Sequence, residues 1–259
     1  MQRRWVELLF GVVVMSASLA SAAAGREEID LRTSQAAIGR AVGNWQLIDQ
    51  RGRALAFADL NDKPVVVNFV YTGCSQVCPA TTQFLKAAVA RARDALGERA
   101  FRVVSIGFNQ PFDGPEALAA FARQQRIDDP EWLFVAPRVQ DVDALLERFG
   151  LTVQRTASGF DHLIQTSIVD RRGIVVRQVY GDNFDLPMLI DPLKQALAGQ
   201  AAEAFSLQNI WTKARLYCTV YDPYTGKYKL DYSLFFELFA GVTTLGAIAW
   251  FLVRNLHRA

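Results

Sequence analysis

The sequence predicts a layered α/β domain followed by a transmembrane helix close to the C-terminus. Pro64–Tyr71 is a β-branched and aromatic run too continuous for a half-exposed strand, so it predicts a central strand covered on both faces. Strand-like and amphipathic helical segments alternate after it, which is typical of a layered α/β domain. Near the end of the chain, Ser233–Val253 is apolar over a length that can cross a bilayer.

The composition fits one globular core and excludes a nucleic-acid-binding surface. The chain has 259 residues, 51% of them hydrophobic, and a formal net charge of +2. One domain therefore remains once the two apolar ends are set aside. The basic residues are scattered among acidic ones, without the basic run that a nucleic-acid footprint needs. Three cysteines and two histidines limit soft-metal or thiol chemistry to few candidate side chains.

Residues 1–24 are predicted to be a secretory signal peptide. Arg3 and Arg4 precede the apolar stretch Leu8–Ala17, and the small residues at positions 20–24 fit an A-x-A cleavage site. A short N-terminal membrane anchor is the alternative. The apolar stretch is shorter than the roughly 20 residues that a span requires, which favours the signal peptide.

Residues 233–253 are predicted to form the transmembrane helix, and residues 254–259 a cytoplasmic tail. Only Glu237 interrupts the span, and Arg254 and Arg258 follow it, so the positive-inside rule leaves the C-terminus in the cytoplasm. The main domain is then expected on the periplasmic side of the inner membrane, in agreement with the signal peptide. A buried core helix is the alternative for this segment.

Between the two ends, residues 25–39 are polar without a clear period and are interpreted as a tether, and residues 40–200 as the folded domain. The domain is expected to begin with a hairpin, Trp45–Ile48 and Ala54–Leu60, before the central strand. The elements expected after that strand are the helix Pro79–Leu96, the strand Phe101–Ile106, the helix Pro115–Arg126, the strand Trp132–Val135, the helix Val139–Phe149, the hairpin strands Ile164–Val169 and Ile174–Tyr180, and the closing helix Leu186–Leu197.

Cys74 and Cys78 carry the candidate chemistry, because they fall between the end of the central strand and the start of the following helix. Unpaired amide groups and the helix dipole at that position stabilise a thiolate, which is both the nucleophile of disulfide exchange and the metal-binding form of cysteine. Three intervening residues allow both sulfurs to lie on one face of the first helical turn, where they can close a disulfide or hold a metal ion. The spacing alone leaves both alternatives open.

His162 is the only histidine in the part of the chain expected to be exported, and we expect it in a loop just before the strand Ile164–Val169. Two thiolates and one imidazole form a soft ligand set that suits copper, especially Cu(I), whereas structural zinc normally takes a fourth protein ligand. Asp161 either orients the imidazole or is a solvated carboxylate. The alternative is a structural disulfide between the two cysteines beside a histidine with no metal role.

The motif C-x-x-x-C-P after a buried strand, which ends at Pro79, together with an Asp-His pair at 161–162 before a late strand, resembles the Sco/SenC family of copper chaperones. The resemblance covers about residues 40–200. It implies a thioredoxin-like, three-layer fold around a central mixed sheet, and one copper ion, Cu(I) or Cu(II), bound by Cys74, Cys78 and His162. It also implies a role in assembling the binuclear copper centre of cytochrome c oxidase.

Two features depart from the usual pattern of that family. Residues 107–110, Gly-Phe-Asn-Gln, stand where family members usually have an aspartate followed by a proline, so an acidic residue that would tune the site or partner docking is replaced. The predicted anchor is C-terminal, whereas many relatives are held by an N-terminal helix, although some bacterial members resemble the present layout.

Residues 201–232 are interpreted as a linker segment between the domain and the membrane. Within it, residues 222–226 (Asp-Pro-Tyr-Thr-Gly) predict a turn between two short strands. Cys218 lies just before them and is left over from the cysteine pair. It is therefore a free thiol, a partner in an intermolecular disulfide, or an additional copper ligand.

These inferences predict an exported, membrane-anchored metallochaperone, a binding protein and not an enzyme, which delivers copper to the copper-containing subunit of a respiratory oxidase. Other copper chaperones or a thiol reductase are further expected partners. The alternative is a thiol–disulfide oxidoreductase in which Cys74 or Cys78 attacks a disulfide of an oxidase subunit or another cuproprotein. Ser158–Thr166 lacks the cis-proline in which thioredoxin-like reductases resemble one another, which favours metal binding. Peroxidase activity is a third alternative, disfavoured by the paired cysteines and the histidine.

Overall fold

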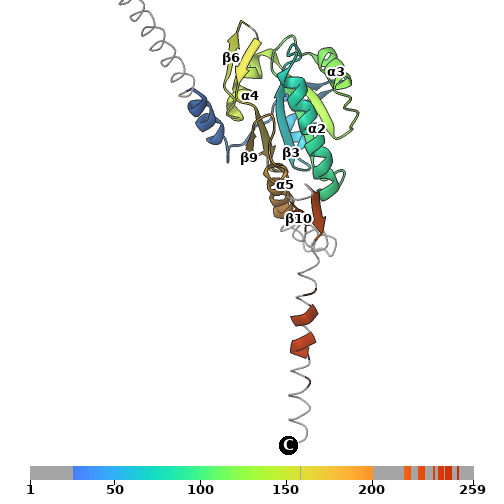
Figure 1. Ribbon diagram of the computed structural model, residues 1–259. Coiled ribbons are helices and arrows are strands. Elements are labelled where there is room, and N and C mark those ends of the chain that lie inside the picture. The colour runs from blue at the N-terminus through green and yellow to red at the C-terminus, as the bar shows by residue number, and fades with distance from the viewer. Residues whose placement is uncertain are drawn as a thin grey trace, which may run out of the picture.

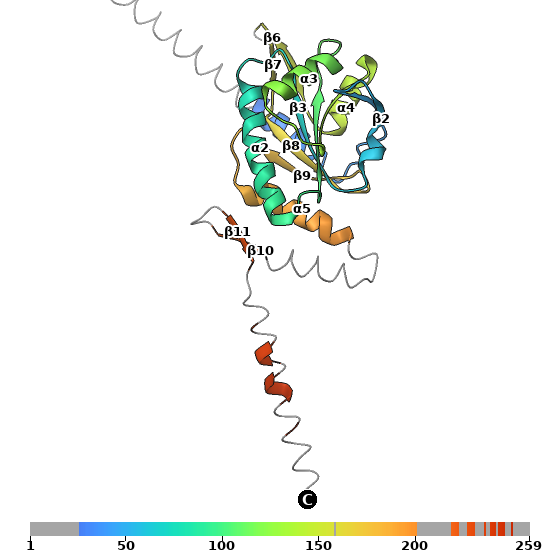
Figure 2. The same ribbon diagram turned by 90° about the vertical axis from the view of Figure 1, so that its right-hand side faces the viewer.

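The computed structural model describes residues 26–157, 159–200, 219–222 and 227–230, together with single residues and short stretches between positions 236 and 250. The predicted signal peptide, Cys218 and the predicted cytoplasmic tail lie outside these residues. The domain is built around a seven-stranded mixed sheet with helices on both faces (Figures 1 and 2). This arrangement confirms the predicted layered α/β fold.

The sheet has the strand order β2-β1-β5-β4-β3-β8-β9. Its strands are β1 (Gln46–Asp49), β2 (Ala54–Ala56), β3 (Val65–Val70), β4 (Arg102–Gly107), β5 (Trp132–Pro137), β8 (Gln165–Val169) and β9 (Val175–Tyr180). β3 pairs in parallel with β4 and antiparallel with β8, which makes the sheet mixed. All six residues of β3 are buried, as expected for a strand covered on both faces.

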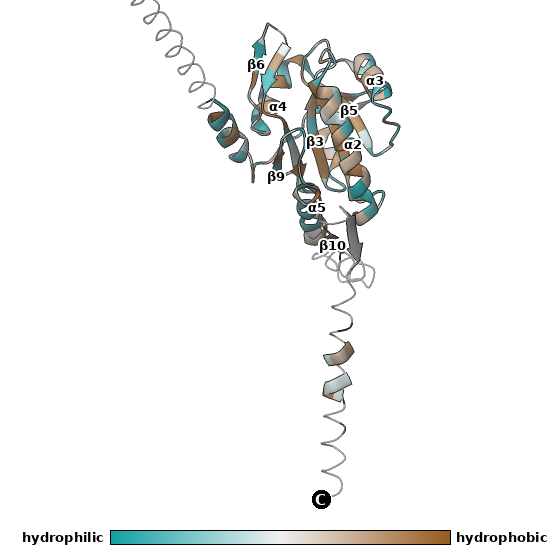
Figure 3. Ribbon diagram, in the orientation of Figure 1, coloured by the Kyte–Doolittle hydropathy of each residue, from teal (hydrophilic) through white to brown (hydrophobic). Residues whose placement is uncertain are grey.

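Helices of unequal length cover the two faces of the sheet (Figure 2). The helices on one face are α2 (Val77–Leu96), α3 (Pro115–Gln124) and α5 (Leu186–Gln200), and those on the other are η1 (Phe57–Leu60) and α4 (Val142–Arg148), which follows η2 (Val139–Asp141). Successive parallel crossovers in one direction place α2 and α3 on the same face. Alternate residues of β3 enter the two cores: Val66 and Val70 pack with α2, whereas Val65 and Val67 pack with α4. In the hydropathy view of Figure 3, β3 and β5 are accordingly apolar.

The predicted elements occur in the predicted order, and most of their ends shift by three residues or fewer. One difference is Phe57–Leu60, which we expected to extend a strand but which forms the 3₁₀-helix η1. Phe57 and Leu60 are both buried. Residues three apart share one face of a 3₁₀-helix, whereas in a strand they would point to opposite faces.

The segment interpreted as a tether is instead helical over residues 26–35 and packs on the domain. Ser34 is fully buried, and its hydroxyl donates to Oε1 of Gln165 at 2.7 Å. Gly150 adopts φ +67°, and a Cβ there would lie 2.6 Å from the carbonyl oxygen of Thr33. These contacts come from residues more than 100 positions away, so the local polar composition does not reveal them.

Two small hairpins lie outside the main sheet. β6 (Val153–Thr156) pairs antiparallel with β7 (Gly159–His162), so His162 ends a strand and is not in the loop that we expected. β10 (Thr219–Asp222) pairs with β11 (Lys227–Leu230), which confirms the two short strands predicted in the segment 201–232. This second hairpin lies beside α2 and α5 (Figures 1 and 2).

The predicted transmembrane helix falls largely outside the described residues. Within the part of the chain that the structure describes, no helix is both long and apolar enough to span a membrane.

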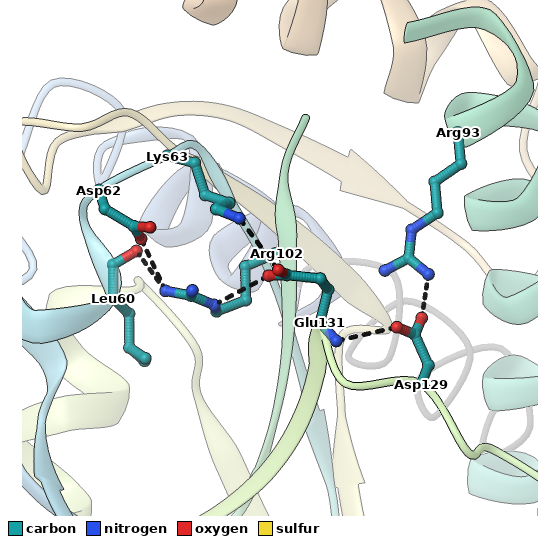
Figure 4. A network of polar contacts seen from close by, with 7 residues as sticks. All are labelled: Leu60, Asp62, Lys63, Arg93, Arg102, Asp129 and Glu131. Atoms are coloured by element: carbon teal, nitrogen blue, oxygen red, sulfur yellow. Dashed lines mark hydrogen bonds and ion pairs between the residues drawn. The ribbon is translucent and has the colours of Figure 1, made fainter. Parts of the chain in front are cut away.

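A group of charged residues connects the starts of the parallel strands, at the end of the sheet remote from the cysteines (Figure 4). Arg102 pairs with Asp62 at 2.8 Å and with Glu131 at 3.4 Å. Glu131 also accepts from Lys63 at 3.1 Å. The loops before β3 and β5 are thereby held on the first residue of β4.

Candidate metal centre

The loop after β3 brings the two cysteines together. The amide of Cys74 donates to the carbonyl oxygen of Tyr71 at 3.1 Å, which closes a tight turn. The amide of Cys78, in the first turn of α2, donates to Sγ of Cys74 at 3.2 Å. Both are free thiols, with Cys78 buried and Cys74 partly exposed. An amide at a helix N-terminus therefore points at the sulfur of Cys74, as the sequence analysis expected.

The two thiols have opposite pKa shifts. Burial acts to raise the pKa of Cys74, but hydrogen bonds from Cys78 and from the amide of Gln76 outweigh it, and the pKa of Cys74 is lowered. Burial dominates at Cys78 and raises its pKa to about 12. Cys74 is therefore the thiol that ionises readily, and Cys78 keeps its proton at neutral pH unless a metal ion replaces it.

Aromatic rings connect the cysteine loop to the hairpin that carries His162. Tyr71 makes edge-to-face contacts with Phe108 and Phe160, whose ring centroids lie 5.7 and 5.1 Å from its own. Phe108 in turn contacts the imidazole of His162 at 5.5 Å. Gly159 leaves room for this packing, because a Cβ at that position would lie 2.4 Å from the hydroxyl oxygen of Tyr71.

The imidazole of His162 is oriented by the backbone. Its Nδ1 lies 3.0 Å from the carbonyl oxygen of Leu163. Because a carbonyl oxygen can only accept, this contact is a hydrogen bond when Nδ1 carries the proton, and Nε2 is then free to bind a metal ion. Asp161 does not orient the ring: it is mostly exposed and forms an ion pair with Arg26 at 3.9 Å.

Cys78 and His162 line one small cavity of about 30 Å³ between α2 and the start of β8. The structure thus joins Cys74 to Cys78 by a hydrogen bond, and Cys78 to His162 across a shared cavity. Among the described residues, no three side chains of the metal-ligating types lie close enough together to hold an ion as they stand. A copper ion bound by all three would therefore draw the ligands together.

Comparison with a protein-family model settles the relationship. A model described as SCO1/SenC matches residues 33–198, which is more than half of the chain. The chain belongs to the SCO1/SenC family. The resemblance inferred from the cysteine motif and the Asp-His pair is therefore confirmed.

Solved structures agree with this SCO1/SenC membership at the level of the fold. A SCO1/SenC family lipoprotein from Bacillus anthracis is 23% identical, with a TM-score of 0.56 over 61% of this chain and 95% of the other. ScoI from Arabidopsis thaliana, solved with copper bound, is 19% identical, with a TM-score of 0.53 over 61% and 98%. BsSco, described as a Sco family cytochrome c oxidase assembly protein with a disulfide switch, is 20% identical, with a TM-score of 0.54 over 61% and 94%. No curated protein matches the sequence significantly.

The SCO1/SenC site contains a buried acid that the sequence analysis did not identify. Asp113 is fully buried and accepts from the amide of Thr72 at 2.8 Å, the hydroxyl of Thr72 at 2.7 Å and the amide of Asn109 at 2.7 Å. Gly107 leaves room for it, because a Cβ there would lie 2.8 Å from Cβ of Asp113. An acidic group is thus present beside the cysteine loop, held by Thr72 and Asn109.

Asn68 is a second residue that the sequence analysis passed over. It lines the cavity that Cys78 and His162 share, from the middle of β3. The available signal was its polarity, because it is the one polar residue within the run Pro64–Tyr71. A polar side chain in a strand covered on both faces needs a partner or a function.

Proposed function

We propose that this SCO1/SenC protein is a copper chaperone that binds one copper ion through Cys74, Cys78 and His162. The observation that carries the proposal is one small cavity shared by Cys78 and an oriented His162, with Cys74 hydrogen-bonded to the amide of Cys78 beside it. Family membership supports it, as do the copper-bound relative from Arabidopsis thaliana and the oxidase-assembly role stated for BsSco.

The chemistry of the ligands explains why copper suits the site. Two thiolates and one imidazole are soft ligands, and Cu(I) accepts three of them without the fourth that structural zinc normally requires. Cys74 supplies a sulfur whose pKa is already lowered, whereas Cys78 must lose a proton when the metal binds. Copper affinity should therefore rise with pH through the neutral range, because binding releases a proton.

The recipient in this proposal is the copper-containing subunit of a respiratory cytochrome oxidase, reached by ligand exchange and without turnover. The signal peptide over residues 1–24 and the span over residues 233–253 would hold the domain on the periplasmic side of the inner membrane. Copper would then be handled at the outer face, where other copper chaperones or a thiol reductase are expected partners.

A copper titration tests the proposal. The mature protein, purified in detergent and reduced under anaerobic conditions, is titrated with Cu(I) against a competing chelator. We expect one tight equivalent, which is lost in the Cys74→Ser, Cys78→Ser double variant and weakened at least about tenfold by His162→Ala. Cys218→Ser is the matched control, and it should leave the tight equivalent in place. A wild-type protein that cannot compete with the chelator would refute the proposal.

Thiol–disulfide exchange is a second candidate function, favoured by the unlike thiols. Cys74, with its lowered pKa, is suited to attack a disulfide of a cuproprotein and release one partner thiolate. Cys78 then attacks the mixed disulfide, which leaves a Cys74–Cys78 disulfide and a fully reduced partner, and a thiol reductase must restore the pair. If Cys78→Ser traps a mixed disulfide with an oxidised oxidase-subunit peptide, this candidate stands; if no adduct forms, it fails.

A further inference from the structure

Asn68 is a buried carboxamide that faces the candidate copper cavity. Only 7% of its surface is exposed. It shares a face of β3 with Val66 and Val70, which pack with Cys78 in the core under α2. Asn68 also lines the cavity together with Cys78 and His162. A polar group therefore lies in the apolar layer where that layer meets the cavity that Cys78 and His162 share.

A chain of buried hydrogen bonds fixes the orientation of this carboxamide. Nε1 of Trp132 donates to Oγ of Ser105 at 2.9 Å, and Oγ of Ser105 donates to Oδ1 of Asn68 at 2.7 Å. The indole nitrogen can only donate, so Oγ of Ser105 accepts from Trp132 and gives its own single proton to Oδ1 of Asn68. Oδ1 of Asn68 is therefore the acceptor in this chain, and the NH₂ group is the free end of the side chain.

That NH₂ group has no hydrogen-bond acceptor among the residues that the structure describes, and it keeps some accessible surface where Asn68 lines the cavity. Two other polar side chains of the cavity wall are engaged: Thr81 donates to the carbonyl oxygen of Val77, and Gln165 bonds with Ser34 and Phe149. A donor in the cavity wall from which no protein group accepts is available to a ligand, and a leucine would fill the same space without offering a donor. The arrangement points to a ligand that accepts a hydrogen bond inside the cavity.

The proposed copper centre carries a negative charge, which a hydrogen-bond donor would stabilise. One Cu(I) ion with two thiolates and a neutral imidazole carries a net charge of −1, and the cavity that holds part of it is otherwise apolar in large part. A hydrogen bond to a cysteine sulfur stabilises the negative charge on it and tunes the metal. The cavity of about 30 Å³ admits no more than a water-sized group, so a bound ion would lie close to its walls.

We propose that Asn68 is a positioning residue of the copper site, whose amide N–H donates to the sulfur of Cys78 when copper is bound. The inference rests on the proposed function. Removal of the donor should raise the energy of the sulfur lone pairs, so the sulfur-to-Cu(II) absorption band moves to longer wavelength. Cu(I) binding should weaken by about tenfold, the lower end of the range known for residues that support metal ligands.

The test compares two variants in which the same chain of hydrogen bonds, from Trp132 through Ser105 to Asn68, is interrupted. Ser105→Ala removes the anchor of the carboxamide but keeps the amide donor in the cavity. The double variant Ser105→Ala, Asn68→Leu removes the donor as well and leaves no buried polar group at position 68 to destabilise the fold. Each is prepared as the mature protein in detergent, titrated with Cu(I) against a chelator, and loaded with Cu(II) for its absorption spectrum.

We expect the double variant to bind Cu(I) about tenfold more weakly than Ser105→Ala and to show the red-shifted band, while Ser105→Ala stays close to wild type. If Asn68 had only a structural role, the Cu(I) affinity and the absorption band would change equally in both variants, because both interrupt the same hydrogen bonds. If both have the same spectrum and affinities within about twofold, the role of Asn68 is refuted while a tightly binding wild type still supports the copper site. If wild type itself binds no copper, the proposed function falls, and this inference with it.

Discussion

Removal of the Asp113 carboxylate should destabilise the domain through the cysteine loop. The side chain is fully buried and accepts three hydrogen bonds, two from Thr72 and one from Asn109. Asp113→Ala leaves all three donors without their acceptor. These hydrogen bonds are partly buried, and one such bond contributes about 0.5–1.5 kcal/mol, so the variant should lose about 1.5–4.5 kcal/mol of unfolding free energy. That is a large part of the 5–15 kcal/mol typical of a domain.

Asp113→Asn provides the matched control, because it keeps the shape of the side chain. Its Oδ1 can still accept from both groups of Thr72, but its NH₂ group then faces the amide of Asn109, so one hydrogen bond is lost. We expect a loss of about 1 kcal/mol. Urea denaturation at pH 7, with slopes compared to confirm two-state unfolding, measures both values. An alanine variant within about 1 kcal/mol of wild type, or an asparagine variant as unstable as alanine, would refute the reasoning.

The same pair of proteins tests the pKa of Asp113. Burial raises this pKa and outweighs the hydrogen bonds that Thr72 and Asn109 donate. A carboxyl whose pKa is higher in the folded than in the unfolded state contributes stability that is complete below the unfolded pKa and is lost as pH rises through the folded one. The stability of wild type relative to Asp113→Asn should therefore increase as the pH is lowered from 7 toward 4. A difference that is constant with pH, or falls toward acid, would contradict the raised pKa.

Two further predictions concern the cysteine loop and its aromatic neighbours. Gly159→Ala places a Cβ 2.4 Å from the hydroxyl oxygen of Tyr71 at φ +132°, so it should lose more unfolding free energy in urea than Gly52→Ala. Gly52 also has a positive φ, of +77°, but nothing lies within 4 Å of its added Cβ, so equal losses would mean that the contact with Tyr71 is unimportant. In a separate experiment at pH 8, iodoacetamide should alkylate Cys74 well before Cys78, because the pKa of Cys74 is lowered and that of Cys78 is about 12. Peptide mass spectrometry measures the two rates, urea-unfolded protein is the control, and equal rates in the folded protein would contradict the assignment.

The strands and helices and their succession along the chain were accessible from the sequence because local patterns indicate them. The β-branched run Pro64–Tyr71 is typical of a strand buried on both faces, and the cysteines follow shortly after its end. The helix over residues 26–35 was missed because a helix this short is marginal by itself and depends on tertiary packing. Its contacts, at Gly150 and Gln165, are not encoded nearby.

The candidate site was predictable in its chemistry and less so in its geometry. Residue types and spacing identified Cys74, Cys78 and His162, but the strand that carries His162 is only four residues long and mostly polar. It pairs with another short polar strand and is held by aromatic packing on Tyr71 and Phe108, so it lacks the apolar alternation by which strands are recognised. Buried groups such as Asp113 act through partners distant in sequence, which no local pattern reveals.

The unequal pKa values of the two cysteines separate the two candidate functions in physical terms. With a pKa of about 12, ionising the thiol of Cys78 at pH 7 costs about 7 kcal/mol, since each pKa unit corresponds to about 1.4 kcal/mol. A soft metal ion can offset that cost, because metal sites bind with energies on the order of 10 kcal/mol or more. Disulfide exchange starts from Cys74, whose lowered pKa makes its thiolate easier to form, and it needs Cys78 only in the resolving step. Copper binding by the proposed ligands would thus require the buried Cys78 and the cavity that His162 and Asn68 line, whereas the first step of exchange would need only the partly exposed Cys74.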